Sequence, residues 1–344
     1  MNTTIKEVAR LAGVSTATVS RVFNKTGSVE EQTRARVQTA AEELRYVPNP
    51  IGRSLSRQRT EVIGLLLPDL FGEFFSEVIR GADETAQRHG YHLLLSSSHS
   101  SRQEIAAALK TMHGRVDSLV IMSPHIDAQT LNANLPHNHP VILLNCQVDD
   151  TSFDSLNIDN YHGAYDMVGH LIEHGHRRIA IITGTPNNLD AEERLRGYRD
   201  AMAQAGCPPE DCLIVQGTFS EASGFEGARS LLSLNPRPTA VFASNDTMAI
   251  GALSALREAG VDIPGDMALA GFDDIPVDQY LTPSLTSVRV GVYNLGVLAI
   301  ERALDAQRQR GEHRRCQQIL ATTLAIRESC GCESPRRPAV KGTD

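Results

Sequence analysis

Aromatic and polar side chains gather at five places in the sequence, each at the end of a short apolar run. These segments are Phe71–Phe75, Thr183–Asp190, Gly217–Phe219, Ser244–Asp246 and Gly271–Asp274. Aromatic rings stack on the C–H faces of sugars, while carboxylate and guanidinium groups bind hydroxyls in pairs. The residue types at these five places therefore predict a site for a small polyhydroxylated ligand.

The elements that position these segments are alternating strands and helices. Apolar runs at Glu61–Pro68, Tyr91–Ser96 and Ser118–Met122 are separated by helical patterns near residues 74–88 and 102–113, and the alternation repeats from 176 to 271. Continuous apolar strands between amphipathic helices indicate a parallel sheet covered on both faces. Ligands bind outside the C-terminal strand ends of such sheets, so two tandem doubly wound units are expected to close on a ligand between them.

The N-terminal region differs in charge and in pattern. Residues 1–60 carry a net charge of +5 in a chain whose total is −8, which indicates a head that binds a polyanion. Thr4 and Glu7 have the spacing of a capping box, and Gly13 separates this first helix from a second one that Ser15 is expected to cap. Ser28–Glu31 has the same capping-box form and is predicted to open a third helix. Three short helices with a tight turn indicate a helix-turn-helix.

The outward face of the second helix carries the groups that would contact DNA. Short hydroxyls reach phosphates, and Arg21 has the planar donor fork that pairs with guanine in the major groove. The alternative interpretation is a three-helix domain with a solvated polar surface. The outward residues are Thr16, Ala17, Thr18, Ser20 and Arg21.

The segment Thr4–Asn24 resembles the DNA-binding head of the LacI/GalR family of bacterial transcription regulators, and the resemblance continues for most of the chain. We also expect Thr4 to be one of the DNA-binding residues of this head. The resemblance implies that base edges are contacted by Thr16, Ala17 and Arg21. It implies phosphate contacts, or orientation on phosphates, for Ser15, Thr18, Ser20 and Asn24.

A short helical pattern with two prolines follows the head, between Tyr46 and Arg59. A helix this short is marginal alone and needs a partner to form. The resemblance implies paired hinge helices in the DNA minor groove, with Leu55 wedged into the central base step. Gly52 raises the cost of ordering this helix by up to ~1 kcal/mol relative to alanine.

The predicted fold class is an all-α helix-turn-helix head plus hinge helix, joined to an α/β body of two doubly wound parallel-sheet subdomains. The head spans 1–47, the hinge helix and linker 48–60, and the effector-binding and dimerisation domain 61–328. The resemblance implies that this body is periplasmic-binding-protein-like, with one subdomain at 61–159 plus 291–325 and the other at 160–290. Residues 329–344, with Cys330 and Cys332 among prolines and basic residues, are expected to form a disordered tail.

The resemblance also assigns roles at the strand ends. It implies that Arg194, Asn245 and Asp273 hold the effector, that Phe219 stacks on it, and that Phe74 and Phe75 close the cleft. Purine-responsive relatives carry a basic residue six positions before the equivalent of Arg194, whereas this chain has Asn188 there and Asp190 two positions on. These residues favour a sugar or glycoside, with a nucleoside or purine as the alternative.

The expected partners are double-stranded operator DNA, the small-molecule effector and a second copy of the chain. One helix-turn-helix contacts few base pairs, so a dimer on a near-palindrome is expected, and the tail lacks the leucine heptads that would favour a tetramer. We interpret the protein as a repressor, with a non-specific architectural DNA-binding protein as the alternative.

Several other classes are disfavoured by the sequence. The six cysteines are scattered without a CxxC pair, and His137 and His139 lack a third ligand nearby, so we expect no metal site and no cofactor. No GxSxG elbow, phosphate loop or GxGxxG follows a predicted strand, which argues against an enzyme. No apolar run approaches the ~18–20 residues of a membrane span, and the N-terminus begins no targeting peptide, so we expect a cytoplasmic protein.

Overall fold

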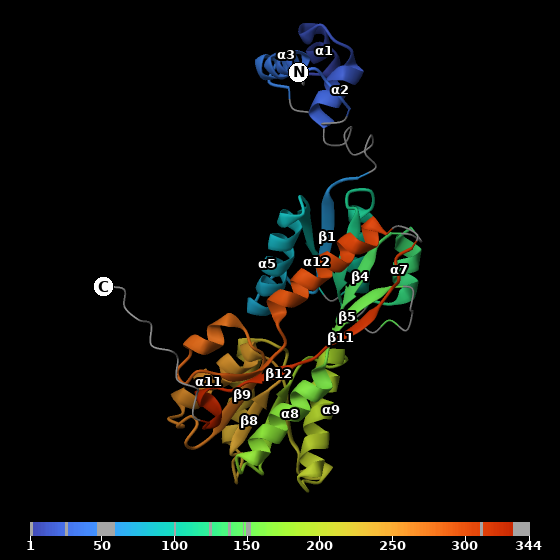
Figure 1. The fold of residues 1–344 in the computed structure, drawn as a ribbon. Helices are drawn as coiled ribbons and strands as arrows, with labels where there is room; N and C mark the ends of the chain where they lie inside the picture. Colours follow the sequence, from blue (N-terminus) through green and yellow to red (C-terminus); the bar gives the residue numbers. More distant parts are fainter. Residues whose placement is uncertain are drawn as a thin grey trace, which may run out of the picture. The chain divides into compact units, whose positions relative to one another are not determined.

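The computed structural model describes residues 3–24, 27–46, 59–99, 101–123, 126–136, 139–146, 148, 153–309 and 312–332. Contacts divide the chain into two units, Met1–Glu61 and Val62–Asp344, which Figure 1 shows. The helices of the described residues include none that is long and apolar enough to cross a membrane.

The first unit is the predicted three-helix head, with α1 (Ile5–Ala12), α2 (Thr16–Asn24) and α3 (Glu31–Glu43). Val8, Val19 and Val37 are fully buried where the three helices meet. The backbone N–H of Thr4 donates to the Glu7 carboxylate over 2.7 Å, which closes the start of α1. Gly13 has a φ of +66°, which a glycine adopts without strain at the turn before α2.

One helix start differs from the expectation. The third helix begins at Glu31, and Glu30 rather than Ser28 occupies its N-cap position. The predicted hinge helix and Leu55 fall at 47–58, outside the described residues.

The second unit contains two sheets, and the first has the strand order β11-β5-β4-β3-β1-β2. Its strands are parallel, and buried apolar side chains fill the central ones because helices cover both faces. Side chains of α5 and α12 pack into one core and those of α6 and α7 into another. The strands are β1 (Val62–Leu67), β2 (His92–Ser97), β3 (Ser118–Met122), β4 (Val141–Leu144), β5 (Asp154–Ile158) and β11 (Gln317–Leu320). The helices are α5 (Glu73–Arg88), α6 (Arg102–Met112), α7 (Ala128–Asn134) and α12 (Val292–Arg308).

The second sheet has the order β12-β10-β9-β8-β6-β7, and only the pairing of β12 with β10 is antiparallel. Helices α8 and α9 pack against each other over one core of this sheet, and α10 and α11 over the other. The strands are β6 (Ile179–Thr183), β7 (Leu213–Gln216), β8 (Ala240–Ala243), β9 (Ala268–Asp273), β10 (Thr286–Arg289) and β12 (Thr323–Ala325). The helices are α8 (Asn160–Glu173), α9 (Leu189–Gln204), α10 (Glu221–Leu232) and α11 (Asp246–Glu258), with 3-10 turns η1 (Pro209–Asp211), η2 (Pro276–Tyr280) and η3 (Glu328–Cys330).

The chain passes between the two sheets at three places. It leaves the first sheet after β5, returns with α12, which lies beside α5 in Figure 1, and crosses again between β11 and β12. The predicted helix-turn-helix head and the body of two doubly wound parallel-sheet subdomains are confirmed. The expected limit at residue 325 for the first subdomain is wrong, because Leu324 pairs with Val288 of the second sheet.

The start of the expected disordered tail is also ordered. Ser329 and Cys330 are buried against β9 and β10, where the Ser329 hydroxyl donates to the Leu269 carbonyl over 2.6 Å. The backbone N–H of Thr286 in turn donates to that hydroxyl over 2.8 Å. These bonds fix residues 329–332 to the second sheet, whereas 333–344 lie outside the described residues.

Candidate ligand site and nucleic-acid interface

The exposed face of α2 matches the face expected to contact DNA. Thr16, Ala17 and Arg21 are exposed, whereas Val19 and Val22 on the opposite side are buried. This division follows from the helical period, which places residues three and four apart on one face. The three exposed side chains are therefore available to a partner.

The other polar residues of α2 are held by local hydrogen bonds. The backbone N–H of Thr18 donates to Ser15 Oγ over 3.1 Å, so Ser15 caps α2 as predicted. The Asn24 side chain donates to Ser20 Oγ over 3.1 Å. These bonds orient short polar groups on the same helix as Arg21.

The candidate ligand site is built around a buried arginine on α9. Arg194 is 3% exposed, and its guanidinium lies 3.7 Å from the centre of the Phe272 ring. Its Nε donates to Asn160 Oδ1 over 2.8 Å, and its Nη1 donates to the Ser244 carbonyl. The side chain is thus held by the start of α8 and by the ends of β8 and β9. Because these contacts hold the Arg194 side chain in place, its guanidinium would lose little conformational entropy on binding a ligand.

Two carboxylates lie beside this arginine. Asp190, one turn earlier on α9, accepts a hydrogen bond of 2.7 Å from Asn160 Nδ2. Asp273, the last residue of β9, places Oδ1 3.5 Å from Arg194 Nη2. That Oδ1 atom is buried and has no hydrogen-bond partner among the described residues. A buried acceptor without a donor costs about 1–3 kcal/mol, which a ligand donor would offset.

Burial changes the acidity of both carboxyls. It raises the pKa of Asp190, against the opposing effects of Arg194, Asn160 and Asn145. It also raises the pKa of Asp273 well above its ordinary value, although Arg194 opposes the shift. Perturbed carboxyls that converge on one buried cation are typical of functional sites.

Phe219 and Asn245 are linked to each other rather than to Arg194. The Asn245 side chain caps α11 by accepting from the backbone N–H of Met248 over 2.9 Å, and its Nδ2 donates to the Phe219 carbonyl. The Phe219 ring is half-buried over Gly184, where a Cβ atom would lie 2.0 Å from the ring. The Asn245 amide is therefore engaged in structure, and Gly184 makes room for the ring.

The first sheet contributes the aromatic pair. Phe74 and Phe75 lie in the first turn of α5, with ring centres 5.4 Å apart at 89°. Both are half-buried and pack against the core that α5 shares with α12. The described contacts join Asp190, Arg194 and Asp273 into one cluster and leave this pair as a separate feature of the other subdomain.

Sequence reasoning missed three residues of the cluster. Asn160 bridges Asp190 and Arg194, Phe272 supports the guanidinium, and the Asn145 side chain acts on the Asp190 carboxyl. Asn160 and Asn145 directly follow Asp159 and the strand β4, so a search for polar residues after every strand would have found them.

Two neighbouring carboxylates have structural partners instead. Asp246 accepts from the Ser287 hydroxyl over 2.6 Å and from the backbone N–H of Ile275 over 3.1 Å. Asp274 forms ion pairs with Arg289 and Arg327. These contacts tie β9 to β10 and to the C-terminal segment, so both carboxyl groups have a structural role.

Two parts of the chain match known protein families. Residues 4–49 match the bacterial regulatory proteins of the lacI family, and residues 168–330 match the periplasmic binding protein-like domain. The transcriptional repressor PurR of Edwardsiella ictaluri is 36% identical over 305 residues, covering 88% of this chain and 89% of the relative.

Solved structures show the same architecture. A lac repressor dimer bound to operator and the anti-inducer ONPF has a TM-score of 0.86 at 28% identity, covering 96% of this chain and 99% of that one. A complex of the regulator CelR with cellobiose has a TM-score of 0.71 at 32% identity, covering 95% of this chain and all of that one.

The helix-turn-helix head and the two-sheet body with its buried polar cluster define a DNA-binding regulator with a ligand-binding domain. The chain belongs to the lacI family of bacterial regulatory proteins and is a transcriptional repressor, not an enzyme.

Proposed function

We propose that this repressor binds a sugar or glycoside at the Arg194 cluster, and that a homodimer of it recognises a near-palindromic operator. The observation that carries the ligand class is the buried Oδ1 atom of Asp273, which accepts no hydrogen bond from the described residues and lies 3.5 Å from Arg194 Nη2. A hydroxyl is both donor and acceptor, so one sugar hydroxyl donates to Asp273 and accepts from Arg194 at once. Aromatic groups at Phe219, Phe74 and Phe75 supply surfaces for sugar C–H faces.

Asn188, directly before α9, also favours a sugar or glycoside as the ligand. The Asn188 side chain accepts from the backbone N–H of Ala191 over 3.0 Å, so it caps α9 and brings no positive charge to the site. The neighbouring Asp190 adds a carboxyl. Carboxyl and amide groups without a further cation suit a neutral ligand with several hydroxyls. The CelR structure, similar to this chain, holds cellobiose.

Isothermal titration of the purified chain against two panels tests the ligand class. One panel contains monosaccharides, disaccharides and glycosides, and the other contains purine bases and nucleosides. We expect saturable binding from the first panel only. Saturable binding of a purine or nucleoside, with none from the sugars, would assign the alternative class.

We infer that ligand binding changes the angle between the two subdomains and thereby the affinity for DNA. Selection of bound duplexes from a random pool, with and without the ligand found by titration, tests this coupling. Enrichment of a near-palindrome establishes a sequence-specific dimer. Loss of enrichment with ligand identifies an inducer, and enrichment only with ligand identifies a corepressor. Absence of any enriched sequence would favour the architectural alternative.

A further inference from the structure

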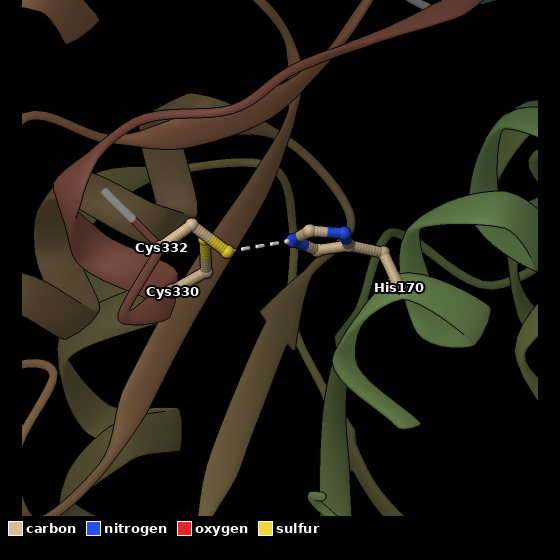
Figure 2. A group of neighbouring side chains, drawn as sticks. All are labelled: His170, Cys330 and Cys332. Carbon is tan, nitrogen blue, oxygen red and sulfur yellow. Dashed lines mark hydrogen bonds between the residues drawn. The ribbon is translucent and has the colours of Figure 1, made fainter. Parts of the chain in front are cut away.

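A second cluster of reactive side chains lies at the other end of α8. His170 on α8, Cys330 at the end of η3 and Cys332 two residues later place one nitrogen and two sulfur atoms within 4.8 Å of one another. Figure 2 shows the three side chains pointing toward one another, with Cys332 Sγ 3.4 Å from His170 Nε2. His170 lies about 15 Å along the helix axis from Asn160, so this cluster is distinct from the ligand site.

A fourth group lies one helical turn further on. His174 Nε2 is 3.0 Å from Cys332 Sγ, and the two imidazole rings are 4.3 Å apart. His174 Nδ1 is 2.8 Å from the His170 carbonyl. Because a carbonyl only accepts, Nδ1 carries the proton, and in the neutral ring the lone pair of Nε2 faces the sulfur. That tautomer is the one in which Nε2 binds a metal.

We propose that His170, Cys330 and Cys332, with His174 as the fourth ligand, bind Zn²⁺. Two thiolates and two imidazoles are a preferred tetrahedral ligand set for this cation. Zn–S and Zn–N bond lengths place tetrahedral ligand atoms about 3.4–3.8 Å apart. Cys332 Sγ lies 3.4 Å from His170 Nε2 and 3.0 Å from His174 Nε2, and the atoms of His170, Cys330 and Cys332 lie within 4.8 Å of one another. These separations bracket that range, so small side-chain rotations would bring these three atoms onto one ion, with His174 reaching it beside Cys332.

The surroundings of the sulfur atoms support a bound cation. Thr286 Oγ1 on β10 lies 3.1 Å from Cys330 Sγ, in position to orient the thiolate. Cys330 is 2% exposed, whereas His174 is exposed, so the cluster has a buried side and an open side by which an ion enters. The ligands come from a helix and from a segment hydrogen-bonded to β9, which restricts their movement.

Among the described residues, the other cysteines form no such group with histidine, cysteine or acidic side chains. Cys146 is buried among backbone carbonyls, and its Sγ lies 3.1 Å from the carbonyl of Leu144. Cys207 and Cys212 both approach the Pro208 carbonyl, with Sγ to O distances of 3.7 and 3.9 Å. That pair offers a matched control, because it has two thiols near each other without the imidazoles.

Cobalt substitution of the full chain tests the proposal. The reduced protein is stripped with a chelator and titrated with Co²⁺ under nitrogen. We expect one equivalent to produce a sulfur-to-metal charge-transfer band and tetrahedral absorption, and one equivalent of Zn²⁺ to displace it. Zinc should also raise the unfolding temperature by linkage to the folded state.

Variants separate ligation from folding. Cys332→Ser and His174→Gln change less buried groups and should weaken Zn²⁺ binding more than tenfold while far-UV circular dichroism is unchanged. Cys207→Ser/Cys212→Ser should retain the full cobalt spectrum. The proposal is overturned if the band is absent or survives Cys332→Ser. A Cys330–Cys332 disulfide that persists in the purified chain under reductant would also overturn it.

Discussion

At the scale of single residues, Arg194 differs from its neighbours on α9 in its partners rather than its type. Its guanidinium is buried against Phe272 and bonded to Asn160, whereas Arg196 is exposed and pairs with Glu193 on its own helix. Sequence pattern alone does not separate the two, because both lie on one helix. Arg194 was predicted from the family resemblance alone. The structure distinguishes it from Arg196 by its burial against Phe272 and its hydrogen bond to Asn160.

Replacing Arg194 by lysine keeps the charge and removes the planar donor fork. We expect Arg194→Lys to weaken the binding of the sugar ligand by about 10–100-fold, as expected for losing one charged hydrogen bond of about 1.5–3 kcal/mol. Isothermal titration measures the change. Arg196→Lys on the same helix is the control and should bind normally. Equal affinities for the two variants would contradict the assignment.

A second residue-scale feature is the buried carboxyl pair of Asp246 and Asp278. Burial raises the pKa of Asp278 to about 7, and it raises the pKa of Asp246 well above its ordinary value. The folded chain therefore holds a proton that the unfolded chain releases at lower pH. Stability from this proton is fully present below the unfolded pKa and is lost as pH rises through the folded pKa.

We expect the urea midpoint of the protein to fall between about pH 4 and 7. Asp278→Asn should flatten this fall, because the amide does not titrate, whereas Asp305→Asn at an exposed site should leave it unchanged. Urea unfolding at several pH values provides the measurement. A slope identical to that of the unmodified chain would show that the pair does not titrate in this range.

At the scale of elements, two glycines set the distance between α5 and α12. A Cβ atom at Gly81 would lie 2.1 Å from the Tyr293 carbonyl, and one at Gly296 would lie 2.2 Å from the Val78 carbonyl. Backbone atoms cannot move aside as a flexible side chain can. The two helices therefore pack closely only because neither position carries a side chain.

Gly296→Ala should lower the free energy of unfolding by about 1–3 kcal/mol, as overpacking does. Gly169→Ala is the matched control, because nothing lies within 4 Å of a Cβ atom there. This helical alanine should stabilise α8 by about 0.5–1 kcal/mol. Thermal or urea unfolding compares the two variants, and equal destabilisation by both would refute the packing argument.

The apolar strands and most helices of the body were predictable, because their periodicity is strong. Helix α8 was missed, since Gly163, Gly169 and His170 interrupt its apolar pattern. The order of Ser329 and Cys330 was missed for a different reason. Their hydrogen bonds go to Leu269 and Thr286, some 40 to 60 positions earlier, and no local pattern records them.

Some residues of the ligand cluster were likewise predictable from the sequence, and others were not. Asp190, Asp273 and their strand ends follow from the rule that polar residues gather at carboxyl edges. The capping role of Asn245 and the bridging role of Asn160 depend on exact side-chain directions. The sulfur and imidazole cluster joins α8 to residues about 160 positions later, which spacing rules for metal motifs do not reach.

At the scale of the whole molecule, DNA recognition and ligand binding belong to different units of the chain. The family resemblance implies a hinge wedge at Leu55, which falls within the first unit, Met1–Glu61. We expect Leu55→Ala to weaken operator binding by about tenfold or more, or ~1.4 kcal/mol. Ligand affinity should be unchanged, because the Arg194 cluster lies in the other unit. Fluorescence anisotropy on the selected operator and titration of the ligand measure the two, and a parallel loss of both would contradict this separation.

The three passages of the chain between the sheets have a consequence for synthesis. When residue 159 leaves the ribosome, the first sheet still lacks β11, and α5 still lacks the helix α12 that covers it. The amino-terminal subdomain can therefore be completed only after almost the whole chain has been translated. Until then, the apolar face of α5 and the edge of β5 remain exposed. A premature stop anywhere before Gln317 deprives both sheets of a strand, so a product truncated there retains neither subdomain intact.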